Sequence, residues 1–211
     1  MKMSAKDTIL ARVRAAIGNA PEPSPIPRAF RQRDERERAA ILEDFIDRLV
    51  DYKALVTRTS AADLPGAIAD ACQQHTIQRL VVPADLSAGW IPDGVTALRD
   101  DPPLTLADLD ESSGVLTGCA LAIAQTGTII LDGGASQGRR ALSLVPDIHL
   151  CVVRAQQVVG LVPEAFALLA QRAARPITLI SGPSATSDIE LIRVEGVHGP
   201  RTLLVFVVHD L

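Results

Sequence analysis

A run of polar side chains near the C-terminus has the composition of a small-molecule binding site, and it separates the last two apolar segments of the chain. Ser184 and Thr186 offer hydroxyls, and either can cap a short helix whose positive end would lie near Asp188. The following glycine–proline frame, GVHGPR, presents His198 and Arg201. His198 can act as an acid or a base near neutral pH, so it is the candidate catalytic residue. The alternative is a capped turn with a hydrogen-bonded histidine.

A second interruption between apolar runs is formed by Gln125, Thr126, Gly127 and Thr128. Gly127 can adopt a positive φ and let a ligand approach the backbone, and the two threonine hydroxyls can hold an anion or a carbonyl oxygen. These four residues are candidate ligand-binding residues. The alternative is an ordinary hairpin turn.

A third polar segment, DGGASQGRR at residues 132–140, places glycines before two arginines. Backbone N–H groups in such a loop can form an anion-binding nest, and arginine matches a phosphate or carboxylate with two parallel hydrogen bonds. Arg140 is therefore a further candidate ligand-binding residue. The alternative is a flexible loop with solvated arginines.

Several other kinds of site are not indicated. The sequence has no glycine-rich nucleotide-binding motif, no HExxH and no GxSxG. Cys72, Cys119 and Cys151 match no zinc or iron–sulfur ligand spacing, and the histidines do not cluster with them. We therefore expect no metal on this chain, and thiols that act as small buried apolar groups.

Composition narrows the class of protein further. The 211 residues are 47% hydrophobic but only 3% aromatic, and the net charge is -4. Few aromatic residues and an acidic balance argue against a nucleic-acid surface. No apolar run approaches the ~20 residues of a membrane span, and the N-terminus has no secretory signal. We expect a cytoplasmic protein that does not insert into membranes.

The elements that would position these side chains begin with an N-terminal appendage. Residues 1–30 read as a helix from Ser4 to Gly18 and a proline-rich linker, and residues 31–211 as an α/β domain. A second helix repeats Ile41 and Phe45 at four-residue spacing. Strand, helix and strand follow from residue 54, as in a βαβ unit, and Thr105 can cap a short helix later in the chain.

The apolar runs CALAIA, TIIL, LCVV, ITLI and LLVFVV are nearly continuous, which is typical of strands covered on both faces. They predict one parallel-rich sheet flanked by helices. Such sheets bind ligands at the carboxyl ends of their strands. We therefore predict one shared pocket, with Gly127, Ser184 and His198 within roughly 12 Å of one another.

The segments AIAQTGTIIL, RRALSLVPDIHLCVV and SGPSATSDIELIRVEGVHGPR, followed by the closing apolar strand, occur in the order found in the LUD domain family. The chain resembles this family over residues 50–211. The resemblance implies a fold like that of the glucosamine-6-phosphate deaminase, ribose-5-phosphate isomerase and CoA-transferase superfamily. It also implies a role in oxidising L-lactate to pyruvate with two iron–sulfur partner proteins, which hold the clusters, so that this chain binds no cofactor.

One position departs from the family pattern. The family usually has Glu before TGT, where this chain has Gln125. A carboxylate can act as a base or a nucleophile, whereas an amide can only hydrogen-bond a carboxylate or carbonyl group. The substitution argues against covalent chemistry at Gln125 and is compatible with a binding role.

Two hypotheses follow. The first is a subunit of a lactate-oxidising iron–sulfur assembly that binds a small anionic metabolite. The second is a free-standing enzyme or sensor for a sugar-phosphate or CoA-type metabolite, which the glycine–arginine loop favours. The sequence leaves open whether the chain is catalytic on its own.

Overall fold

The chain divides into two units, which are described separately. The computed structural model describes residues 4–18, 24–27, 29–170, 175–187, 193–195 and 198–210, with the backbone alone at 185–187 and 193–195. The first unit spans Met1–Arg31 and the second Gln32–Leu211.

The first unit contains α1 (Ala5–Ile17). The helix begins where the Ser4 hydroxyl accepts a hydrogen bond from the N–H of Asp7, and it ends at Gly18 with a φ of +52°. Both ends agree with the sequence prediction. The helix buries none of its residues.

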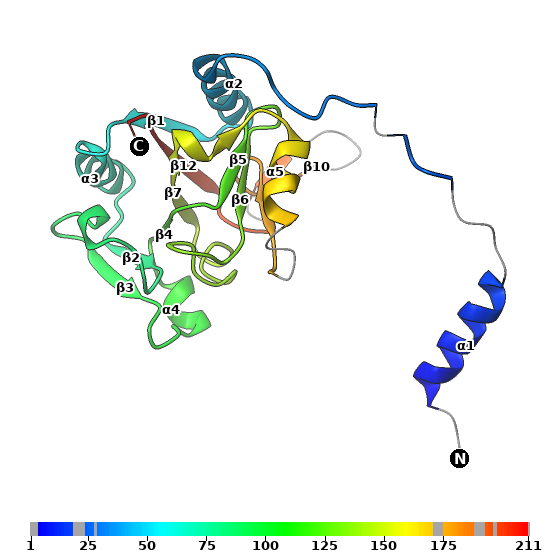
Figure 1. Cartoon of the computed structure of the whole chain (residues 1–211). Helices are drawn as coiled ribbons and strands as arrows, with labels where there is room; N and C mark the ends of the chain where they lie inside the picture. Colours follow the sequence, from blue (N-terminus) through cyan, green and yellow to red (C-terminus); the bar gives the residue numbers. More distant parts are fainter. Residues whose placement is uncertain are drawn as a thin grey trace. The chain divides into compact units, whose positions relative to one another are not determined.

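The second unit contains both strands and helices (Figure 1). Its helices are α2 (Arg38–Asp51), α3 (Leu64–Gln74), α4 (Leu106–Asp110) and α5 (Val162–Leu169), with 3-10 turns η1 (Ala88–Trp90) and η2 (Ala155–Gln157). Its strands are β1 (Leu55–Thr59), β2 (Arg79–Val82), β3 (Thr96–Arg99), β4 (Gly114–Thr117), β5 (Leu121–Ile123), β6 (Thr128–Leu131), β7 (Ile148–Arg154), β8 (Val158–Val159), β9 (Thr178–Ile180), β10 (Ala185–Ser187), β11 (Arg193–Glu195) and β12 (Thr202–Val208).

The main sheet has six parallel strands in the order β1-β12-β7-β4-β2-β3. β1 and β2, predicted as a βαβ unit, run parallel in this sheet, but β12, β7 and β4 lie between them. β7 and β12, which are neighbours in the interior of this sheet, are its longest strands and are almost continuously apolar. Their interior position follows because strands of this composition must be covered on both faces.

The predicted α/β class, with a parallel-rich sheet flanked by helices, is confirmed, but the prediction that all of the apolar runs join one sheet is wrong. β5, β6 and β9 join β8 in a separate sheet ordered β8-β5-β6-β9, in which β6 pairs antiparallel with both neighbours. A short hairpin turn joins β5 to β6, which leaves no crossover helix to return the chain in parallel. The two sheets therefore stack face to face instead of continuing one another.

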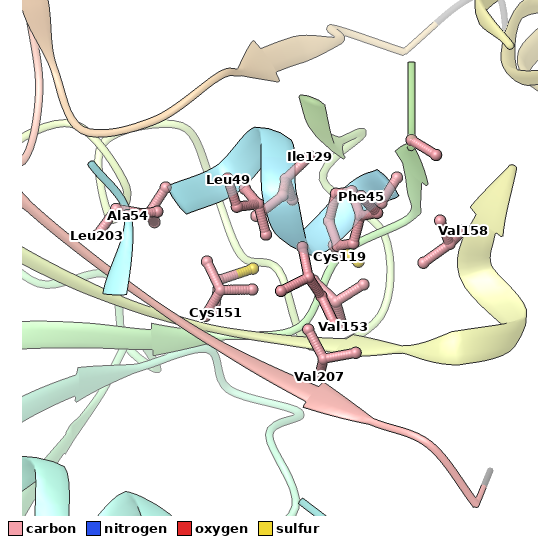
Figure 2. Packing of buried hydrophobic residues seen from close by; sticks show 14 of the residues in the cluster. Phe45, Leu49, Ala54, Cys119, Ile129, Cys151, Val153, Val158, Leu203 and Val207 are labelled. Carbon is pink, nitrogen blue, oxygen red and sulfur yellow. The ribbon is translucent and has the colours of Figure 1, made fainter. Parts of the chain in front are cut away.

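The faces of the main sheet carry separate cores. Leu150 and Phe206 lie in the core that packs against α3. The opposite face packs against α2 and the four-stranded sheet, and Figure 2 shows Phe45 and Leu49 of α2 over the strand that carries Cys151. α5 covers the outer face of the four-stranded sheet. The order of layers is thus α3, main sheet, four-stranded sheet with α2, and α5.

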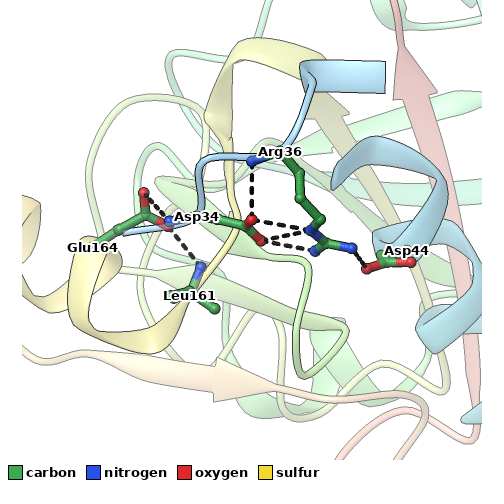
Figure 3. Close-up of polar contacts among 5 residues, drawn as sticks. All are labelled: Asp34, Arg36, Asp44, Leu161 and Glu164. Carbon is green, nitrogen blue, oxygen red and sulfur yellow. Dashed lines mark hydrogen bonds and ion pairs between the residues drawn. The ribbon is translucent and has the colours of Figure 1, made fainter. Parts of the chain in front are cut away.

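The segment that enters the second unit is anchored by Asp34, whose side chain is 1% exposed (Figure 3). Its carboxylate accepts a hydrogen bond from Arg36 at 3.0 Å, and its N–H donates to Glu164 of α5. A Cβ at Gly160 would overlap the Cβ of Asp34. The glycine before α5 is therefore required by this close approach.

Candidate functional site

A pocket of about 230 Å³ lies at the amino ends of β7 and β12, where His149 and Leu203 are register partners. This differs from the expected position at the carboxyl ends of the strands, because the polar segment leads into β12 rather than out of a parallel strand. The pocket is lined by residues 178–184 and 198–200 together with Arg140, Ser143, His149 and Leu203.

Ser184 joins the two sides of this pocket. Its N–H donates to the carbonyl of Pro200 at 2.8 Å, and its hydroxyl accepts a hydrogen bond from the N–H of His198 at 2.9 Å. A Cβ added at Gly199 would lie 3.7 Å from the Cβ of Ser184, so the two residues are close neighbours. Ser184 and His198, predicted to share a site, therefore line the same pocket.

The segment from Gln125 to Thr128 forms a hairpin turn beside the pocket and does not belong to its lining. Gly127 has a φ of +57°, and a Cβ there would lie 2.7 Å from the Cβ of Arg48 in α2. The glycine is thus needed for packing on α2. The Thr128 hydroxyl contacts the Ser181 hydroxyl at 2.8 Å, so the turn supports one side chain of the pocket.

The other two residues of this turn have local partners. The hydroxyl of Thr126 is 2.7 Å from that of Thr128, and the N–H of the exposed Gln125 donates to the carbonyl of Gly160 at 3.0 Å. The hairpin alternative accounts for these contacts. The predicted shared pocket therefore contains Ser184 and His198 but not Gly127.

The arginines that follow the glycine-rich loop separate. Arg139 pairs with Asp100 at 2.9 Å and donates to the carbonyl of Leu104 at 2.6 Å, away from the pocket. Arg140 lines the pocket and donates to the Ser143 hydroxyl at 3.1 Å. Within the described part of the chain Arg140 has no ion-pair partner, and partial burial lowers the pKa of its guanidinium. Arg140 is therefore the cation available to an anionic ligand.

The remaining predicted residues lie elsewhere. Arg201 forms an ion pair with Asp147 at 2.6 Å and is absent from the pocket lining. Thr186 lies on β10, which pairs antiparallel with β11. Asp188 lies outside the described residues. Residues 185–187 are extended on β10 rather than helical, and the rest of the predicted short helix lies outside the described residues.

His149 is a pocket residue that the motifs did not indicate. It is 1% exposed, and its Nε2 lies 2.8 Å from the Thr117 hydroxyl. Burial, and secondarily the nearby charge of Arg140, lower the pKa of His149 to about 4, so the ring is neutral at pH 7. The available signal was a single histidine inside an otherwise apolar run, IHLCVV.

The pocket is suited to a small monoanion. It contains one guanidinium, a neutral imidazole and the hydroxyls of Ser143, Ser181 and Ser184, and no carboxylate appears among its described lining residues. Leu203 and Ile180 add apolar surface. Its volume lies below the 300–1,000 Å³ typical of drug-sized ligands, which favours a molecule of few atoms.

Two further properties concern the described residues only. No group of three histidine, cysteine or acidic side chains there could hold a metal ion. None of the helices there has the length and apolarity that crossing a bilayer requires.

Comparison with known proteins identifies the family and the relatives that this chain resembles. Residues 105–208 match the LUD domain. Lactate utilization protein C of Deinococcus radiodurans is 54% identical over 92% of this chain and 91% of its own length. Its namesake from Geobacillus kaustophilus is 26% identical over 97% of this chain and 96% of its own.

A solved structure is also similar. The crystal structure of a DUF162 family protein from Deinococcus radiodurans superposes with a TM-score of 0.72 at 51% identity. The match covers 82% of this chain and 99% of that one.

Proposed function

This chain belongs to the LUD domain family, and we propose that it is a lactate utilization protein C-like subunit that takes part in oxidising L-lactate to pyruvate. The observation that carries the proposal is the pocket in which Arg140, without an ion-pair partner among the described residues, lies beside a neutral His149. The names of the relatives supply the pathway, and the pocket supplies a place for a small hydroxy acid.

The lining matches the groups of lactate one by one. The carboxylate would pair with Arg140, because a guanidinium offers two parallel donors. The hydroxyl would meet the imidazole of His149 and the hydroxyl of Ser143, and the methyl group would face Leu203. His198, which is exposed in the lining, is the residue that would exchange a proton with solvent.

The electrons of the reaction would leave through partner proteins. Iron–sulfur clusters on those partners would accept them in the cytoplasm, while this subunit holds the substrate anion. Gentle purification from cells grown on lactate tests this role. Co-purification with iron–sulfur proteins is expected, and recovery of this protein alone would contradict the subunit role.

We expect Arg140→Ala to weaken L-lactate binding roughly 10- to 100-fold, since a hydrogen bond to a charged group contributes about 1.5–3 kcal/mol. Stability should change by less than about 0.5 kcal/mol, as is usual for an exposed side chain without an ion pair. Isothermal titration calorimetry with L-lactate and pyruvate measures the first effect, and thermal unfolding measures the second.

The matched control is Arg201→Ala, which removes a neighbouring arginine that pairs with Asp147 outside the pocket. An exposed ion pair of this kind contributes little to stability. Lactate affinity should stay within about twofold of the wild type in this variant. Equal losses in the two variants would show that the effect is general electrostatics, and the pocket assignment would fail.

A further inference from the structure

A second cavity, of about 370 Å³, lies at the opposite end of the main sheet from the first. Its lining includes Gly118 after β4, Arg154 at the end of β7, and Trp90. His149 and Arg154 are five positions apart on β7, which corresponds to roughly 17 Å at ~3.3 Å per residue. The two cavities are therefore distinct sites.

The position of this cavity is the one at which parallel sheets usually bind ligands. β3, the next strand in the chain after β2, lies on one side of β2 in the sheet. The chain then returns, and β4 lies on the other side of β2. The connections that leave β2 and β4 thus diverge, which opens a crevice at their carboxyl ends. Trp90 from the first connection and Gly118 from the second both line the cavity.

Two arginines bring positive charge to this crevice. The Arg154 guanidinium lies 5.9 Å from the centre of the Trp90 ring, and within the described residues it has no carboxylate partner. Arg175 lies 3.7 Å from Asp132, whose carboxylate also accepts hydrogen bonds from the Gly134 N–H at 3.0 Å. No acidic residue appears among the described residues of the lining.

The glycine-rich loop completes the wall in a strained conformation. Ser136 has a φ of +58°, which is uncommon for a residue other than glycine. Its N–H donates to Asp85 at 2.9 Å, and its carbonyl accepts a hydrogen bond from the Gly118 N–H at 2.7 Å. Strain held by surrounding contacts is common where a loop is preformed for a ligand.

We propose that this second cavity binds a phosphorylated metabolite through Arg154 and Arg175. Arg154 supplies a guanidinium without a carboxylate partner among the described residues, and Arg175, although it pairs with Asp132 at 3.7 Å, has further N–H donors for a phosphate oxygen, whereas the first pocket offers one guanidinium. The larger volume admits further atoms beyond the phosphate, next to the indole face of Trp90. The glycine-rich loop thus contributes to a site separate from that of Arg140.

The test uses the fluorescence of Trp90, because the chain contains a single tryptophan. Inorganic phosphate, glycerol 3-phosphate and ribose 5-phosphate are titrated into the full-length protein. A saturable change in emission is expected, since a phosphate that engages Arg154 alters the contact between guanidinium and ring. Malonate and succinate serve as dicarboxylates of equal charge and should bind at least tenfold more weakly.

The decisive variants are Arg154→Gln and Arg175→Gln, each expected to weaken phosphate-ester binding at least tenfold. Arg140→Gln, in the first pocket, should leave this affinity within twofold. L-lactate binding by Arg154→Gln and Arg175→Gln serves as a check that the first pocket is intact.

Three outcomes would overturn the proposal. One is the lack of any saturable change in emission with phosphate esters at millimolar concentration. Another is wild-type affinity in both Arg154→Gln and Arg175→Gln. The third is a loss in Arg140→Gln as large as in Arg154→Gln, which would place the ligand in the first pocket. Failure of lactate to bind would contradict only the proposed function, because lactate binding and phosphate-ester binding depend on different residues.

Discussion

Replacing Gly182 by alanine is expected to destabilise the second unit by roughly 3 kcal/mol, the sum of backbone strain and a steric clash. Gly182 has a φ of +81°, a conformation that L-residues rarely adopt. A Cβ there would lie 2.6 Å from the carbonyl oxygen of Tyr52 and 2.7 Å from its Cβ. Because one contact is with backbone at the end of α2, no side-chain rotation can relieve it.

Gly94 provides a matched control. It has the same φ of +81°, but an added Cβ would meet nothing within 4 Å. Gly94→Ala should therefore lower the free energy of unfolding only by the backbone strain, about 1 kcal/mol. Urea denaturation of both variants measures the difference as a shift in midpoint at unchanged slope. Equal costs at the two positions would contradict the close approach of Gly182 to Tyr52.

Gly182 also lines the first pocket, so its variant has a functional consequence. A displaced chain at Gly182 moves the adjacent Ser181 and Ser184, and lactate binding should weaken in Gly182→Ala. Gly94→Ala should bind lactate like the wild type. The pair of variants thus separates loss of the pocket from general destabilisation.

Acidification from pH 7 to pH 5 is expected to reduce the stability of the second unit by roughly 2 kcal/mol through His149 alone. Burial lowers the pKa of this histidine in the folded protein from 6.5 to about 4. Between these two values the unfolded chain binds a proton that the folded chain does not, so proton uptake favours unfolding. The contribution of the neutral His149 to stability is fully present above about pH 6.5 and is lost as the pH falls towards about 4.

His149→Gln isolates this contribution, because glutamine can still hydrogen-bond the Thr117 hydroxyl but does not titrate. Urea denaturation of both proteins at pH 7, 6 and 5 should give a smaller loss of stability in the variant, by roughly 2 kcal/mol at pH 5. The paired measurement cancels the other titrating groups, which are the same in both proteins. Parallel pH profiles would mean that His149 is not buried as a neutral ring.

Much of the fold could be predicted from local patterns. The caps of α1 are set by Ser4 and Gly18, and the capping box of α4 by Thr105 and Asp108, which accept each other's N–H hydrogens. The inward face of α2 follows from residues at four-residue spacing such as Phe45. These features depend on interactions within one or two helical turns, so neighbouring residues are sufficient to specify them.

The division into two sheets could not be predicted in the same way. The runs that form β5, β6, β7, β9 and β12 are all apolar, although they lie in different sheets and Leu179 of β9 is exposed. Composition therefore does not distinguish a strand of the main sheet from one of the four-stranded sheet. That choice depends on pairing between segments far apart in the chain.

The candidate site, like the fold, could be predicted only in part from local sequence. Residue types near positions 140, 184 and 198 already indicated hydroxyls, a guanidinium and an imidazole suited to a small anion, and Arg140, Ser184 and His198 line one pocket. His149 could not be recognised as a pocket residue from its own neighbours, because its hydrogen-bond partner Thr117 lies 32 residues away. Which arginine faces the pocket and which is neutralised likewise depends on distant partners, Asp100 for Arg139 and Asp147 for Arg201. Local sequence specifies what chemistry each segment can offer. Long-range strand order and ion pairing select which side chains meet, because the energy of those contacts exists only once the sheets are packed.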